Sequence, residues 1–151
     1  MIPKLFLDYS YPYNRLFNKI LGKSFSDEDL IELKEKYAKF EKLYYKYAEK
    51  ILELIEKYNE PWQKKVIRIY PAGEMLPFSV SSPLTLKYDE NERYLLVVLI
   101  HELIHNNFFE KKFPNRKELH QYIAKIMEKV CSELDLDLEE ERKKLEEITT
   151  K

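Results

Sequence analysis

The chain has 151 residues, a length that fits a single domain with one hydrophobic core. Apolar residues make up 44% of it and charged residues 35%, which predicts a folded rather than a disordered chain. The 26 Lys and Arg residues nearly balance the 27 Asp and Glu residues, so the charge gives no reason to expect a nucleic acid or an anionic membrane as a partner.

Further features of the sequence narrow the class of protein. The only cysteine, Cys131, excludes an internal disulfide and predicts a reducing compartment. The longest uncharged apolar run, residues 94–100, is too short to cross a bilayer, and the N-terminus lacks the apolar core of a signal peptide, so we expect a cytoplasmic protein. The two glycines, Gly22 and Gly73, argue against a glycine-rich phosphate loop. The abundance of Lys and Glu is typical of thermostable proteins.

The first half of the chain is predicted to be helical. A short helix is expected over Asn14–Leu21 and ends at Gly22. Another is expected to begin after Ser26, because a serine three residues before an acidic residue, here Asp29, is typical of a helix N-cap. From there, apolar residues recur every three or four positions, and no Gly or Pro interrupts them. This heptad seam predicts one continuous helix over residues 27–58, roughly 45–50 Å long, lying along the rest of the domain. A coiled-coil dimer through the same seam is the alternative, so we expect a monomer or a homodimer.

A small sheet is expected between the two helical halves of the chain. Val66–Tyr70 has the β-branched and aromatic content of a strand. Phe78–Ser81 and Leu84–Tyr88 alternate in polarity, and Pro77 and Pro83 confine them to edge or bulged positions. The predicted fold class is therefore α+β, with a mixed sheet that has an edge strand.

The second half contains two further predicted helices and a charged tail. One helix runs from about Asp89 to about Phe109, and its middle, Leu95–Ile100, is apolar on every side, which predicts a central buried helix. The next begins after Asn115, which with Glu118 fits a capping box, and runs to about residue 134. We expect one domain over residues 1–135. Residues 136–151 form a highly charged tail, either a frayed helix or a mobile segment.

The buried helix carries the motif that points to chemistry, His101-Glu102-Leu103-Ile104-His105. Two histidines four residues apart lie on one helix face, so both imidazoles can bind one cation, and Zn²⁺ is the metal that suits them. Glu102 is rotated by about 100° from His101 and can reach a water molecule on the same metal. The alternative is that both histidines bond to backbone carbonyls and Glu102 forms an ion pair.

A catalytic zinc site needs a third protein ligand. At about 100° per residue, His120 lies about 50° from the centre of the apolar face of its helix, whereas Glu118 lies about 150° away. His120 is therefore the expected third ligand. Glu118 and Glu128 remain alternatives, and a histidine that only packs at the core boundary is another.

His-Glu-Leu-Ile-His resembles the active-site motif of the zincin metallopeptidases. The layout of the chain resembles the gluzincin branch and especially the minigluzincins. In this layout a backing helix is followed by a small sheet, the motif helix and a further helix, and the resemblance covers about residues 66–134. The resemblance implies that His101 and His105 bind zinc and that Glu102 is the general base and acid. Gluzincins take a glutamate from the downstream helix as third ligand, and this chain departs from their usual spacing. Phe108 and Lys111 replace the Gly and the third His of the metzincin pattern.

The resemblance also implies how a substrate binds. Zincins of this type bind an extended peptide antiparallel to an edge strand, and Phe78, Ser79, Val80 and Ser81 are the best candidates for that strand. Tyr88, Tyr94 and Tyr122 are candidates for stabilising the oxyanion. Minimal zincins can be latent, with a terminal segment in the cleft, so the tail is a possible inhibitor through Asp135, Asp137 or Cys131.

The sequence therefore predicts a zinc-dependent peptidase whose partners are peptide or protein substrates. A non-catalytic, metal-stabilised helical protein that dimerises through the residue 27–58 seam is one alternative. A hydrolase with a different substrate is another, because the motif specifies an activated water and not its target.

Overall fold

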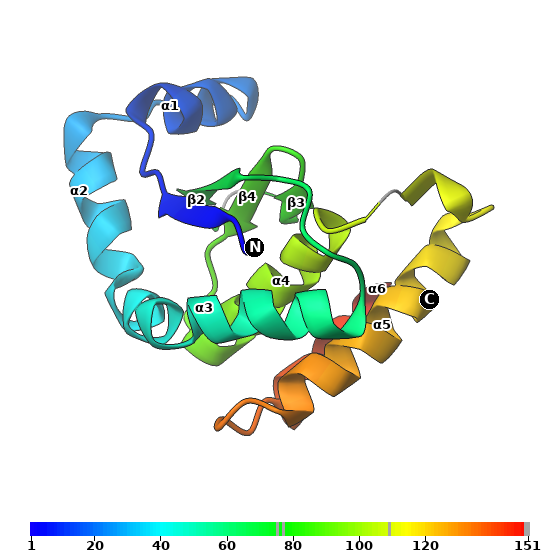
Figure 1. Cartoon of the computed structure of the whole chain (residues 1–151). Helices are drawn as coiled ribbons and strands as arrows, with labels where there is room; N and C mark the ends of the chain where they lie inside the picture. Colours follow the sequence, from blue (N-terminus) through cyan, green and yellow to red (C-terminus); the bar gives the residue numbers. More distant parts are fainter. Residues whose placement is uncertain (75, 77, 109, 150–151) are drawn as a thin grey trace.

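A computed structural model gives the structure of the chain and describes residues 1–74, 76, 78–108 and 110–149. Figure 1 shows a small sheet with α1 above it and α3 and α4 below it, and with α5 and α6 further along α4. The elements in chain order are β1 (Lys4–Leu7), α1 (Tyr11–Ile20), α2 (Asp27–Lys36), α3 (Ala38–Tyr58), β2 (Val66–Ala72), β3 (Val80–Ser81), β4 (Leu84–Lys87), α4 (Glu92–His105), the 3₁₀ turn η1 (Glu110–Lys112), α5 (Arg116–Ser132) and α6 (Glu139–Thr149).

The sheet is mixed, and it confirms the predicted α+β class. Its strand order is β1-β2-β4-β3, with parallel pairs β1–β2 and β2–β4 and an antiparallel pair β3–β4. β3 lies at one edge, as expected, but it contains only Val80 and Ser81 of the predicted strand over residues 78–81. The strand shortens because the hydroxyl of Ser79, not a backbone carbonyl, accepts the hydrogen bond from the backbone N–H of Lys87.

The long backing helix predicted over residues 27–58 is wrong in one respect: it is two helices. The chain turns at Tyr37, between α2 and α3, and the two helices run in different directions in Figure 1. The Tyr37 side chain is fully buried, and its hydroxyl donates to the carbonyl oxygens of Ala72 at 2.6 Å and Leu86 at 3.1 Å. The break therefore attaches the junction of α2 and α3 to the neighbouring strands β2 and β4.

The apolar seam of residues 27–58 faces the chain's own core. Its buried members are Leu33, Tyr37, Phe40, Tyr44, Tyr47, Ile51 and Leu54. The residues that widen the seam are less uniform, because Ile31 and Tyr45 are exposed whereas Leu52 is buried. The face on which the predicted dimer depends is thus largely occupied by intramolecular packing.

Helix α4 is the central buried helix that the sequence predicts. Asn91 caps its N-terminus by accepting hydrogen bonds from the backbone N–H groups of Arg93 and Tyr94. Every residue over 95–104 is buried, against α3, β4, α5 and α6. The helix ends at His105, earlier than predicted, and Phe109 lies outside the described residues.

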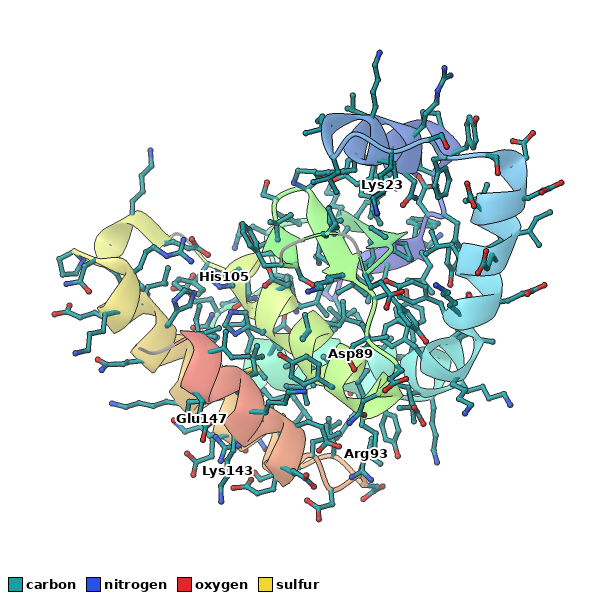
Figure 2. All side chains as sticks on the ribbon, turned by 180° about the vertical axis from the view of Figure 1, so that it is seen from behind. Lys23, Asp89, Arg93, His105, Lys143 and Glu147 are labelled. Carbon is teal, nitrogen blue, oxygen red and sulfur yellow. The ribbon has the colours of Figure 1, made fainter. Side chains whose placement is uncertain are left out.

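The predicted tail contains an ordered helix that packs into the same core. Leu138 and Leu145 are buried there, and α6 contacts both α4 and α5. Lys143 and Glu147 lie on its outer face (Figure 2). Within the described part of the chain, no helix is both long enough and apolar enough to span a membrane.

Candidate metal centre

Three histidine side chains from two helices meet beside the sheet edge. His101 and His105 lie on one face of α4, and His120 comes from the first turns of α5. The nearest ring nitrogens of the three residues all lie within 4.8 Å of one another. The Nε2 atoms of His101 and His105 are 3.1 Å apart, close to the separation of about 3.3 Å that two tetrahedral zinc ligands show.

The two most buried rings of this cluster favour the neutral form. Burial lowers the pKa of His101 well below its ordinary value, and the neighbouring rings of His105 and His120 act in the same direction. Burial also lowers the pKa of His120. A neutral imidazole keeps the lone pair that a metal needs, so the donor set fits a borderline-soft divalent cation such as Zn²⁺.

Glu102 lies directly beside the cluster. Its Oε1 atom is 4.0 Å from the Nε2 atom of His101, and its side chain is almost fully buried. Burial raises the pKa of Glu102 to about 8, with the charge of Glu110 adding to this effect and that of Arg116 opposing it. A carboxyl group with a pKa near neutrality is suited to exchanging protons with a reacting water molecule.

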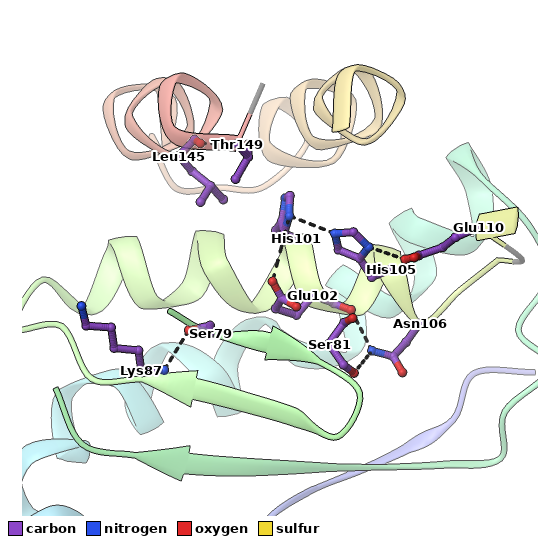
Figure 3. A network of polar contacts seen from close by, with 10 residues as sticks. All are labelled: Ser79, Ser81, Lys87, His101, Glu102, His105, Asn106, Glu110, Leu145 and Thr149. Carbon is purple, nitrogen blue, oxygen red and sulfur yellow. Dashed lines mark hydrogen bonds and ion pairs between the residues drawn. The ribbon is translucent and has the colours of Figure 1, made fainter. Parts of the chain in front are cut away.

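Glu110, on the turn η1, contacts the cluster from outside. Its carboxylate is hydrogen-bonded to the Nδ1 atom of His105, and the Nε2 atom of the same ring faces His101 (Figure 3). Carboxylates that hold the far nitrogen of a metal-binding histidine fix its tautomer and orientation. Glu110 was not predicted from the sequence, where the only signal was an acidic residue five positions after the motif.

The loop that carries Glu110 is anchored at both ends. Before it, the buried side chain of Asn107 accepts from the Nδ2 of Asn59 and from the backbone N–H of Glu60. After it, the ammonium group of Lys112 lies 5.1–5.6 Å from the centroids of three aromatic rings, those of Phe108, Phe113 and Tyr122. These contacts hold η1 where Glu110 reaches His105.

The edge strand is tied to the motif helix. Asn106, directly after α4, donates from Nδ2 to the carbonyl oxygens of Ser81 and Glu102, both at 2.8 Å (Figure 3). The four residues 78–81 line the same cavity as the three histidines, and the side chain of Phe78 is 65% exposed. The structure thus brings together the predicted edge residues and the predicted metal ligands.

The cavity has a volume of about 440 Å³ and is lined by residues from five segments of the chain. These are the β3 segment, α4, Glu110 of η1, the first turns of α5 and the end of α6. The residues that line it are Phe78, Ser79, Val80, Ser81, His101, Glu102, His105, Glu110, Arg116, Lys117, Leu119, His120, Ile148 and Thr149. Glu118 and Glu128, the alternative third ligands, are exposed side chains of α5 that do not line it.

Two groups of predicted residues lie elsewhere. The hydroxyl of Tyr122 donates to Asn59, and neither Tyr88 nor Tyr94 lines the cavity, so these oxyanion candidates are not at the site. Cys131, Asp135 and Asp137 line a different cavity. The tail approaches the histidines through Thr149 at the end of α6 instead, above His101 in Figure 3, because the helix runs back along α5.

Comparison with protein-family models, with curated proteins and with solved structures gives no match to this chain.

Proposed function

We propose that the chain is a zinc-dependent, cytoplasmic peptidase that hydrolyses peptide bonds with Glu102 as general base. One observation carries the proposal: three imidazole groups converge within 4.8 Å, beside a buried carboxyl group, in a cavity bounded by an edge strand. Zn²⁺ bound there would polarise the scissile carbonyl and lower the pKa of a water molecule toward about 7.

Each residue of the cluster has a distinct role in the proposal. His101, His105 and His120 hold the metal, and Glu110 orients His105. Glu102 accepts the proton of the attacking water and delivers it to the leaving amine. The Val80–Ser81 edge positions an extended peptide across the cavity, with Phe78 contacting one of its side chains.

The end of α6 restricts access to the cavity in this proposal. Ile148 and Thr149 line it, so the C-terminal segment lies where part of a substrate would bind. The protein is then partly latent, and displacement of the last turn of α6 opens the site.

Peptide hydrolysis by the zinc-loaded full chain tests the proposal. We expect cleavage of a peptide library at elevated temperature, its loss on chelation, and its return with added Zn²⁺. The Glu102→Gln variant should keep the metal and lose hydrolysis by a factor of about 10² or more. If the wild-type chain binds zinc and cleaves nothing, the non-catalytic metal-stabilised protein becomes the better account. Hydrolysis of another substrate class alone would indicate a different hydrolase.

A further inference from the structure

Arg116 is a charged side chain in the cavity with no assigned role in the proposed reaction. It is the first residue of α5, it is exposed, and it lines the cavity together with Glu102 and His120. No ion pair joins Arg116 to another residue in the described part of the chain. The next residue, Lys117, also lines the cavity and is exposed.

Two carboxyl groups, those of Glu102 and Glu110, share the cavity with these two cations. The carboxylate of Glu110 is bonded to His105, and Glu102 is buried beside His101. A divalent metal on the three histidines would add further positive charge. The cavity therefore presents a guanidinium group that forms no ion pair with the described residues to whatever enters it.

We propose that Arg116 binds a carboxylate of the substrate, so that the preferred substrates are peptides with a carboxylate close to the scissile bond. This inference rests on the proposed peptidase function. The planar guanidinium group presents paired N–H donors that match the two oxygens of a carboxylate, and such charged hydrogen bonds are stronger than neutral ones.

An apolar side chain at the cavity completes this specificity. Phe78, just before β3, lines the cavity, and its side chain is 65% exposed. Such an exposed apolar group favours an apolar side chain on the same substrate. The carboxylate has two possible sources, the C-terminus of the peptide or an Asp or Glu side chain. The guanidinium group of Arg116 can bind a carboxylate from either source.

Matched peptides distinguish these sources and test the proposal. One pair differs only in a free or an amidated C-terminus, and a second amidated pair has Glu or Gln next to the scissile bond. We expect the carboxylate member of at least one pair to have the higher kcat/KM. Arg116→Gln should lower that kcat/KM about tenfold to a hundredfold, mainly through KM, relative to the kcat/KM of the uncharged member of the same pair. Lys125→Gln, an exposed lysine on α5 outside the cavity, is the matched control and should change nothing.

A binding measurement separates this inference from the proposed function. In the zinc-loaded Glu102→Gln chain, labelled carboxylate peptides should bind, and adding Arg116→Gln should weaken binding about tenfold or more, whether or not the wild type cleaves them. Equal affinity for both members of each pair overturns the inference. So does an Arg116→Gln effect on kcat/KM that is the same for charged and uncharged peptides, because Arg116 would then act through the pKa of Glu102 and not on the carboxylate.

Discussion

The carboxylate of Glu110 is hydrogen-bonded to the Nδ1 atom of His105, and the Nε2 atom of the same ring lies 3.1 Å from the Nε2 of His101. One contact on each side of the imidazole thus fixes both its tautomer and its direction. The pair joins the turn η1 to the motif helix and makes a short loop part of the candidate metal centre.

Replacing Glu110 by Gln should weaken zinc binding. The amide cannot supply the negative charge that holds the protonated Nδ1 atom, so we expect the zinc affinity to fall about tenfold to a hundredfold. Competition with a chromophoric chelator measures this. The exposed Glu118, which lies outside the cavity, provides the control: Glu118→Gln should leave the affinity unchanged. Equal affinities for wild type and Glu110→Gln would show that Glu110 does not support the site.

Shortening α6 should increase hydrolysis. A chain that ends at Glu147 lacks Ile148 and Thr149, which line the cavity, but keeps Leu138 and Leu145, which are buried in the core. We expect a several-fold higher kcat/KM for peptides. The unfolding temperature, measured in parallel, should change little, whereas deletion of residues 136–151 should lower it. Unchanged kcat/KM in the shorter chain would mean that the tail does not block the site.

Tyr37→Phe should destabilise the fold. The substitution removes the hydroxyl that donates to the carbonyl oxygens of Ala72 and Leu86, which are then left with one fewer partner in the core. The expected loss is about 1–3 kcal/mol in the free energy of unfolding, measured by urea denaturation. Tyr45, which is 73% exposed, is the matched control, and Tyr45→Phe should have no measurable effect. Equal stability of both variants would contradict the role assigned to the Tyr37 hydroxyl.

Cys131 should be unreactive in the folded protein. Burial raises the pKa of its thiol to about 12 from an ordinary value of 9.0, so almost no thiolate exists at pH 8. A disulfide reagent that reports free thiols should react only after denaturation. Because the folded state holds this proton more tightly than the unfolded state, the free energy of unfolding should fall as the pH rises between about 9 and 12. Fast labelling of the native chain at pH 8 would show that the thiol is accessible.

Local patterns in the sequence were sufficient for the elements with strong periodicity. The all-apolar middle of α4 predicts its burial, and the capping residue Asn115 predicts the start of α5. The break at Tyr37 was missed because residues 36–38 continue the helical pattern, and its cause lies in carbonyl groups of strands far along the chain. β1 was not predicted, because a strand of only four residues, without alternating polarity, gives too weak a signal.

The candidate site, too, was predicted only where a local pattern in the sequence places its residues. The spacing of His101 and His105 and the helical angle of His120 predict side chains that lie together. Glu110 and Arg116 could not be found in this way, because their approach to the site depends on how the loop after α4 folds back. The docking of α6 could not be predicted because the helix is highly charged: Leu145 is the only buried apolar residue within Glu139–Thr149, and the buried Leu138 lies just before it.

X-ray absorption spectroscopy of the zinc-loaded full chain tests the central claim most directly. The account predicts one zinc ion per chain, with three imidazole nitrogens and one further light atom at about 2.0–2.1 Å. The spectrum of His120→Ala should contain one imidazole fewer, and that of Glu118→Gln should be unchanged. A chain that does not retain zinc, or a bound ion without imidazole ligands, would contradict the claim that these three histidines form one metal centre.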